Sequence, residues 1–190
     1  PAGDKTAASG EWKQGPGAAY IHAIQKNLPD LEFIAEDLGY VTPEVRQLQE
    51  TSGYPGMKVL QFAFDSRENS DYLPHTYPVN SVCYTGTHDN LTLAQWFEEA
   101  SPEDISLARE YLGLNKEEGL IRGMIRGAMS SVSRLCVIQM QDYLELGGYA
   151  RMNFPGTLSS ENWTWRAPKD FITESLTKQI YSMTQRYGRL

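Results

Sequence analysis

The sequence predicts an α/β fold in which parallel strands alternate with helices. Four short apolar runs are each bounded by turn residues, and within a run the apolar residues are nearly continuous. This pattern is typical of strands that are covered on both faces, as in parallel sheets. Helical patterns lie between and around the runs, and such an alternation favours right-handed βαβ units. We therefore expect about four βα units with parallel strands.

The predicted strands are short and rich in apolar residues, as strands of buried sheets usually are. In chain order they are LEFIA (residues 31–35), KVLQFAF (58–64), VCYTG (82–86) and LCVIQM (135–140).

The predicted helices combine apolar residues at helical spacing with recognisable starts. They cover residues 17–28, a segment beginning at Thr42 and Pro43, a segment beginning at Ser101 and Pro102, and residues 116–132 and 168–187. Thr42 and Ser101 are typical N-caps, and each precedes a proline that suits the first helical turn. A further helix near Leu91 would have Asp89 as its cap.

The number of units limits the architecture. A closed eight-unit barrel usually needs about 250 residues, so four units make half a barrel with open edges. A small doubly wound sheet is the alternative. No break in composition and no internal repeat divides the chain, so we treat residues 1–190 as a single fragment.

Composition and charge argue against several classes of function. The net charge is -7 and no Lys/Arg cluster could follow a phosphate backbone, so we expect no nucleic-acid partner. No apolar run approaches the ~18 residues that a membrane helix needs. Three histidines without CxxC or HExxH spacing predict no metal site, and no motif indicates a cofactor. Cys83 and Cys136 lie inside apolar runs, which favours a reducing, cytoplasmic location.

Polar residues follow each predicted strand, at the edge where α/β proteins collect their function. These residues are Glu36 and Asp37 after the first strand, Asp65 after the second, His88 and Asp89 at the third, and Gln139, Gln141 and Asp142 at the fourth. Any one of these acids could simply cap a helix or pair with a surface cation. We expect Asp37 to be structural, preparing the turn at Gly39.

Glu36 together with His88 and Asp89 indicates glycosidic chemistry. Such chemistry uses one carboxylic acid to protonate the leaving oxygen and a second carboxylate that faces the developing positive charge. His88, beside Asp89, could donate to a sugar hydroxyl.

Five blocks of the sequence, in order, resemble those of the amylomaltases, the 4-α-glucanotransferases also called disproportionating enzymes. The blocks are GEWKQGPG (residues 10–17), FIAEDLG (33–39), GYPGMKVLQFAF (53–64), YTGTHDN (84–90) and RMNFPGTLSSENWTWR (151–166). The resemblance implies the C-terminal half of a TIM (β/α)8 barrel, with roughly barrel strands five to eight. It also implies α-1,4-glucans and malto-oligosaccharides as substrates.

When the functional residues of the family are matched to positions of this sequence, the resemblance implies two catalytic groups and three substrate-binding groups. Glu36 would be the general acid/base, partly buried among other carboxylates in the intact enzyme. Asp89 would stabilise the oxocarbenium-like transition state, and His88, Asn153 and Asp65 would bind sugar. Trp12, Trp163 and Trp165 could stack on glucose rings or equally well pack in a core.

The family is retaining and needs a carboxylate nucleophile, which the resemblance places before the first residue of this chain. We therefore expect the chain to be the C-terminal part of a longer enzyme, to need the N-terminal part as its partner, and to be inactive alone. An α-amylase-like glucan hydrolase and a non-catalytic glucan-binding module remain as alternatives.

Overall fold

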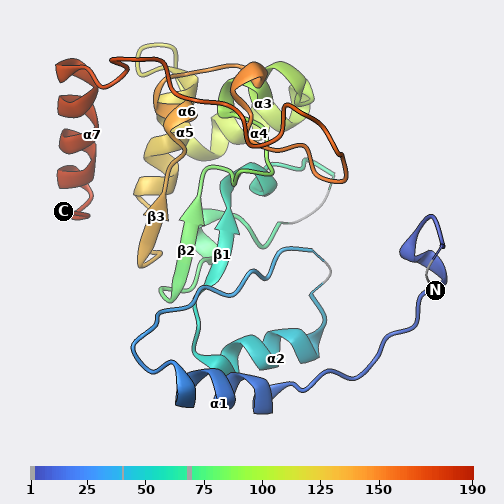
Figure 1. The fold of residues 1–190 in the computed structure, drawn as a ribbon. Helices are drawn as coiled ribbons and strands as arrows, with labels where there is room; N and C mark the ends of the chain where they lie inside the picture. Colours follow the sequence, from blue (N-terminus) through green and yellow to red (C-terminus); the bar gives the residue numbers. More distant parts are fainter. Residues whose placement is uncertain (1–2, 40, 68–69) are drawn as a thin grey trace. The chain divides into compact units, whose positions relative to one another are not determined.

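The computed structural model describes residues 3–39, 41–67 and 70–190 of the chain (Figure 1). The chain divides into two compact units, Pro1–Pro55 and Gly56–Leu190. Among the described residues, every helix is too short or too polar to span a bilayer.

The N-terminal unit consists of two helices and extended segments. It contains the 3-10 helix η1 (Ala7–Ser9) and the helices α1 (Ala18–Asn27) and α2 (Pro43–Ser52). The two helices are linked by a hydrogen bond of 3.0 Å from Gln25 Nε2 to the carbonyl of Ser52. Thr42 caps α2 by accepting from the backbone N–H of Val45, with Pro43 in the first turn, as predicted.

The predicted strand at residues 31–35 is wrong. Only Ala35 makes a strand-like bridge, and its N–H donates to the carbonyl of Pro55 at 2.9 Å. Residues 31–34 of the run have no regular secondary structure. Within this unit the ring of Phe33 packs on Tyr54 with centroids 5.3 Å apart, whereas Leu31 and Ile34 of the same run are exposed.

The C-terminal unit is built on a parallel sheet, which confirms the predicted α/β class. Its strands are β1 (Gly56–Val59), β2 (Ser81–Tyr84) and β3 (Leu135–Val137), hydrogen-bonded in the order β1-β2-β3. Val82 of β2 lies in register with Met57 and with Leu135. Three of the four predicted strands therefore form this sheet, rather than four.

The strands are also shorter than predicted, because two apolar runs change direction at the carboxyl edge. The second run passes from β1 into the 3-10 helix η2 (Leu60–Ala63), and the fourth passes from β3 into the short helix α6 (Met140–Tyr143). Leu60 and Phe64, at the end of the second run, are fully buried and contribute to the core, and Ile138 of the fourth run is partly buried against it.

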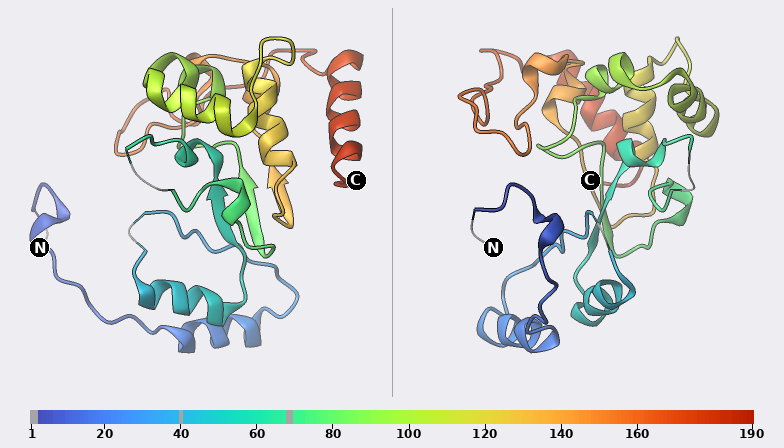
Figure 2. Two further views of the ribbon diagram at one scale, coloured as in Figure 1. Left: turned by 180° about the vertical axis from the view of Figure 1, so that it is seen from behind. Right: turned by 90° about the vertical axis from the view of Figure 1, so that its right-hand side faces the viewer.

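The remaining helices lie beside or beyond the sheet. They are α3 (Leu93–Glu99), α4 (Pro102–Leu112), α5 (Leu120–Met129) and α7 (Glu174–Arg186), with the 3-10 helices η3 (Pro74–Thr76) and η4 (Gly148–Ala150). In Figures 1 and 2, α3 to α5 gather near the carboxyl ends of the strands. Helix α5 begins later than predicted because residues 115–118 form a turn, with the N–H of Glu118 donating to Asn115 Oδ1.

The core of this unit joins the sheet to those helices. Its fully buried members include Leu60, Phe64, Leu93, Met124 and Ile125, which come from η2 and its end, α3 and α5. Burial of several large apolar side chains makes the carboxyl edge of the sheet a rigid platform. The segment between β2 and α3 leaves from that edge.

The N-cap of α4 gives a direct test of the fold. Ser101 Oγ accepts from the N–H of Asp104 at 3.1 Å, and substitution of such a cap by alanine costs about 1 kcal/mol. We expect Ser101→Ala to lower the free energy of unfolding by that amount in denaturant titrations. Ser106→Ala, on the exposed surface of the same helix, is the control and should change it by less than about 0.5 kcal/mol.

Candidate active site

The segment that follows β2 is a compact turn that presents His88 and Asp89. Asn90 Oδ1 accepts hydrogen bonds from both the N–H and the hydroxyl of Thr87 at 2.8 Å. The N–H of Asn90 donates to the carbonyl of Thr87 at 3.1 Å. Gly86 is tightly enclosed, because a Cβ there would lie 2.6 Å from Gln61 Nε2. The turn is thus fixed by its own polar groups and by the sheet edge below it.

Asp89 is held by a segment far away in the sequence. Asn153 Nδ2 donates to Asp89 Oδ1 at 2.6 Å, and the N–H of Asn153 donates to the carbonyl of His88 at 3.1 Å. Arg151 connects the same two segments, since its guanidinium donates to the carbonyls of Asp89 and Asn153 at 2.6 and 2.9 Å. The structure therefore brings together three of the predicted site residues, His88, Asp89 and Asn153.

His88 lies between Asp89 and an aromatic ring. Its Nε2 is 3.4 Å from Asp89 Oδ1, and its ring centroid is 4.8 Å from that of Trp163. The side chains of His88 and Asp89 are 52% and 43% exposed, so a ligand can reach both. Trp163 has a left-handed backbone (φ 64°) and donates its N–H to the carbonyl of Met152 at 2.7 Å, which places its ring beside the histidine.

A buried carboxylate lies behind this turn. Asp142, on α6, is only 1% exposed. Its Oδ2 accepts from the Thr85 hydroxyl at 2.6 Å and its Oδ1 accepts from the N–H of Leu93 at 2.8 Å. Burial raises the pKa of Asp142 from 3.8 to about 6, because neither partner is a cation that would compensate for the lost solvation.

Thr92, and not Asp89, caps helix α3. Thr92 Oγ1 accepts from the N–H of Gln95 at 3.2 Å, and the helix begins at Leu93. The capping role considered for Asp89 is therefore wrong, and its carboxylate is held by Asn153 instead.

Asp65 has different neighbours from the other predicted site residues. Arg67 Nε donates to Asp65 Oδ1 at 2.7 Å, and this contact with the guanidinium lowers the pKa of Asp65 to about 2. Asp65 lines a cavity of about 600 Å³ together with Phe62, Tyr72 and Trp96. Its assignment as a sugar-binding residue stays a prediction.

Glu36 belongs to the N-terminal unit and Asp89 to the C-terminal unit. The expectation that both act on the same sugar therefore stays a prediction. Glu36 is exposed in this chain, and its partial burial in the complete enzyme stays a prediction. It follows Ala35 in a segment without regular secondary structure. Gly39 adopts φ 107°, in the left-handed region, as suits the turn expected there; the role of Asp37 stays a prediction.

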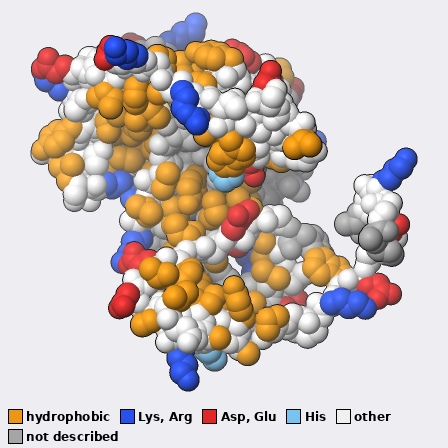
Figure 3. All heavy atoms as spheres, in the orientation of Figure 1, with side chains coloured by type: hydrophobic (Ala, Val, Ile, Leu, Met, Phe, Trp, Pro, Cys, Tyr) orange, Lys and Arg blue, Asp and Glu red, His pale blue; other side chains and the backbone are white. Residues whose placement is uncertain are grey.

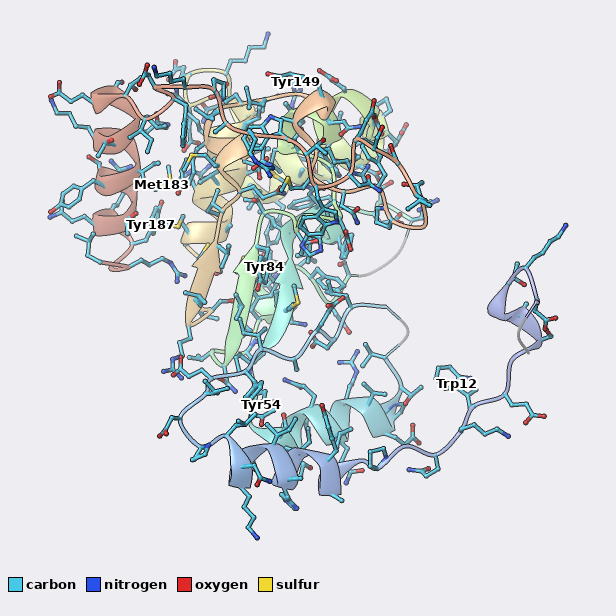
Figure 4. The ribbon with its side chains drawn as sticks, viewed as in Figure 1. Trp12, Tyr54, Tyr84, Tyr149, Met183 and Tyr187 are labelled. Atoms are coloured by element: carbon cyan, nitrogen blue, oxygen red, sulfur yellow. The ribbon has the colours of Figure 1, made fainter. Side chains whose placement is uncertain are left out.

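Two of the three tryptophans considered are not core residues. Trp12 is 92% exposed and projects from the extended segment before α1 (Figure 4), and Trp163 is 52% exposed. The sequence argument placed Asp142 at the functional edge without giving it a role, and it did not single out Arg151. A signal was available for each: Arg151 opens the RMN block, and Asp142 is an acid beside an apolar run.

The described residues hold no cluster of three or more His, Cys, Asp or Glu side chains suited to a metal ion. The site consists of a carboxylate, an amide, an imidazole and an aromatic face. Such a set can accept from and donate to hydroxyl groups, and the carboxylate can face a developing positive charge.

Comparison with known proteins gives a family and close relatives. Residues 1–173 match the glycoside hydrolase 77 family model, described as 4-alpha-glucanotransferase. A 4-alpha-glucanotransferase of Clostridium butyricum is 47% identical over 188 residues, which are 98% of this chain and 38% of that protein. One of Thermus thermophilus is 43% identical, over 100% of this chain and 39% of the relative. The chain thus spans well under half the length of these relatives.

Solved structures agree with the sequence comparison. The amylomaltase of Streptococcus agalactiae in complex with acarbose superposes with a TM-score of 0.91 at 35% identity, over 98% of this chain and 38% of that one. The amylomaltase of Corynebacterium glutamicum gives a TM-score of 0.61 at 20% identity, which shows likeness of fold.

The buried carboxylate of Asp142 predicts a pH dependence of stability. Because its pKa is about 6 in the folded protein and 3.8 ordinarily, the native state binds more protons than the unfolded state between these values. Stability should therefore fall as the pH rises from 4 to 7, by on the order of 3 kcal/mol from this group. Urea titrations of the wild type and Asp142→Asn across this range measure it.

The asparagine side chain of the variant does not titrate. The unfolding free energy of the wild type should therefore fall relative to that of Asp142→Asn as the pH rises from 4 to 7. Asp30→Asn, at an exposed position, is the matched control and should run parallel to the wild type. A pH-independent difference between wild type and Asp142→Asn would contradict the prediction.

Proposed function

Since this chain belongs to the 4-alpha-glucanotransferase family, we propose that it supplies the acid/base part of an enzyme that transfers α-1,4-glucan segments. The acceptor is the 4-hydroxyl of another glucan or of glucose. The observation that carries the proposal is the cluster of Asp89, Asn153 and His88 at the carboxyl end of β2.

Asp89 has the geometry of a transition-state stabiliser. Its Oδ1 receives the amide of Asn153 and faces His88, whereas no described contact falls on Oδ2. A carboxylate held by one oxygen keeps the other for a sugar hydroxyl. Its negative charge, aimed by fixed donors, stabilises an oxocarbenium-like ring without reorganisation during the reaction.

Glu36 is the proposed general acid/base. In the first step it protonates the glycosidic oxygen, the bond from that oxygen to the anomeric carbon breaks, and a carboxylate outside this chain bonds to the anomeric carbon. In the second step, the ionised Glu36 takes the proton of an acceptor 4-hydroxyl, whose oxygen displaces that carboxylate. Two displacements retain the anomeric configuration.

We propose that the chain is the C-terminal half of a TIM barrel and that the N-terminal part of the same enzyme completes it. Parallel sheets are normally covered on both faces, yet Leu135 and Val137 of the edge strand β3 are 48% and 40% exposed. Figure 3 shows hydrophobic side chains gathered over the sheet. An exposed apolar sheet and edge favour further strands as their cover.

Malto-oligosaccharides are the proposed ligands. The streptococcal relative is described in complex with acarbose, and the rings of Trp163 and His88 offer an apolar face beside the carboxylate. The cavity with Asp65, Phe62 and Tyr72 is a second place where a glucose unit could be bound. Cys83 and Cys136 are free thiols on neighbouring strands, in keeping with a cytoplasmic enzyme.

Glu36→Gln in the complete enzyme tests the catalytic role. The amide cannot transfer the proton, so conversion of maltotriose into glucose and longer oligosaccharides should fall about 10²- to 10⁴-fold. Product analysis by chromatography measures it. Glu32→Gln, four residues earlier and also exposed, is the control and should retain wild-type turnover. Undiminished transfer in Glu36→Gln would exclude this residue, and an unaltered profile altogether would favour a binding module.

The isolated 190-residue chain gives a second test. Because it carries no proposed nucleophile, incubation with maltotriose should yield neither glucose nor longer oligosaccharides. Adding the N-terminal part should restore both products. Sustained product formation by the pure chain would refute the division of catalytic groups, and glucose release without longer products in the complete enzyme would indicate a hydrolase.

A further inference from the structure

The segment that carries His88 and Asp89 is tied at both of its ends to one buried side chain. Asp142 Oδ2 binds the hydroxyl of Thr85, at the start of the segment, and Oδ1 binds the N–H of Leu93, at its end. The contacts span 57 and 49 positions of sequence. Asp142 thereby fixes the two ends of the segment relative to each other, which limits the conformations open to residues 86–92.

The residue before Asp142 holds the second segment of the site. Gln141 Nε2 donates to the carbonyl of Ala150 at 3.2 Å, and both residues are buried. Ala150 directly precedes Arg151, which in turn donates to the carbonyls of Asp89 and Asn153. Two adjacent side chains on α6 therefore anchor the two segments that meet at the Asp89–Asn153 hydrogen bond.

Burying the carboxylate of Asp142 costs solvation free energy that a purely structural contact would not require. Asp142 is 1% exposed, and its contacts are one hydroxyl and one backbone N–H, with no cation beside it. An ionised carboxylate in such a place opposes folding, and an apolar side chain would fill the volume without that penalty. An apolar side chain could not accept from Thr85 and Leu93 together, so what the carboxylate provides is their relative position.

We propose that Asp142, assisted by Gln141, is a positioning residue that sets the location of Asp89 and its partner Asn153 for the transfer reaction. The inference deepens the proposed function and rests on it. Asp142 acts through the backbone of the segment, and its carboxylate faces Thr85 and Leu93, not the turn that presents His88. The expected consequence of its loss is a misplaced Asp89, and a displacement of about 1 Å costs roughly 10²-fold in rate.

The test compares Asp142→Leu with Asp142→Asn in the complete enzyme. Leucine keeps the approximate volume but accepts no hydrogen bond, so kcat for maltotriose transfer should fall about 10²-fold, with a smaller change in KM. Asparagine can still accept from Leu93 with its oxygen and can donate to the Thr85 hydroxyl oxygen, so it should stay within about tenfold of the wild-type kcat. Equal losses in both variants would overturn the proposal.

A matched variant separates positioning from loss of stability. Leu176→Ala, in α7, removes a buried apolar side chain that is not part of the candidate site. It should lower the thermal midpoint while kcat per folded enzyme stays at the wild-type value. If Leu176→Ala lowered kcat as much as Asp142→Leu at a similar midpoint, the effect would be general destabilisation, and the proposal would fail.

Hydrogen exchange tests the anchor without using activity. The N–H of Leu93 should be protected in the wild type, and Asp142→Leu should speed its exchange together with the amides of residues 86–92, while α7 is unchanged. Unchanged exchange at Leu93 would overturn the anchor even in an active enzyme. If the wild type transferred no glucan, the proposed function would fail, and faster exchange in the leucine variant would still support the anchor.

Discussion

The hydrogen bond from Asn153 to Asp89 is the contact on which the candidate site depends. It joins residues 64 positions apart, at 2.6 Å, and the backbone of Asn153 holds the carbonyl of His88 in the same place. A carboxylate that is half exposed is otherwise free to rotate among conformers. With one oxygen fixed, its charge is aimed before any ligand arrives, which is the condition for electrostatic stabilisation of a transition state.

The surroundings of this contact show two kinds of support. Apolar packing of Leu60, Phe64, Leu93 and their neighbours makes the sheet edge rigid, and this packing stabilises the fold. Asp142 adds buried polar contacts at a cost in solvation, which its raised pKa reflects. Such a combination, stable packing with a locally unfavourable group, is expected where a protein must hold functional side chains in one arrangement.

The helices were the most predictable elements, because their signals are local. Thr42 and Ser101 cap helices as expected, since an N-cap needs only a side-chain oxygen a few residues before the N–H that it accepts from. The strands were less predictable. The run at residues 31–35 has strand composition, yet only Ala35 makes a bridge, and two other runs pass into helices where the sheet ends. Strand formation depends on a partner that is distant in sequence.

By itself, the sequence determined the α/β class, the family and the chemical types that the site would contain, because composition, spacing and motif blocks are properties of the chain. The tertiary structure decided which of these groups meet. It brought Asp89 into contact with His88 and Asn153 and paired Asp65 with Arg67. It also placed Asp142 behind the turn that carries His88 and Asp89. The contacts of Asp89 with Asn153 and of Asp142 with Leu93 join residues 64 and 49 positions apart, where burial and hydrogen-bond geometry in the folded chain select one partner among several of the same chemical type.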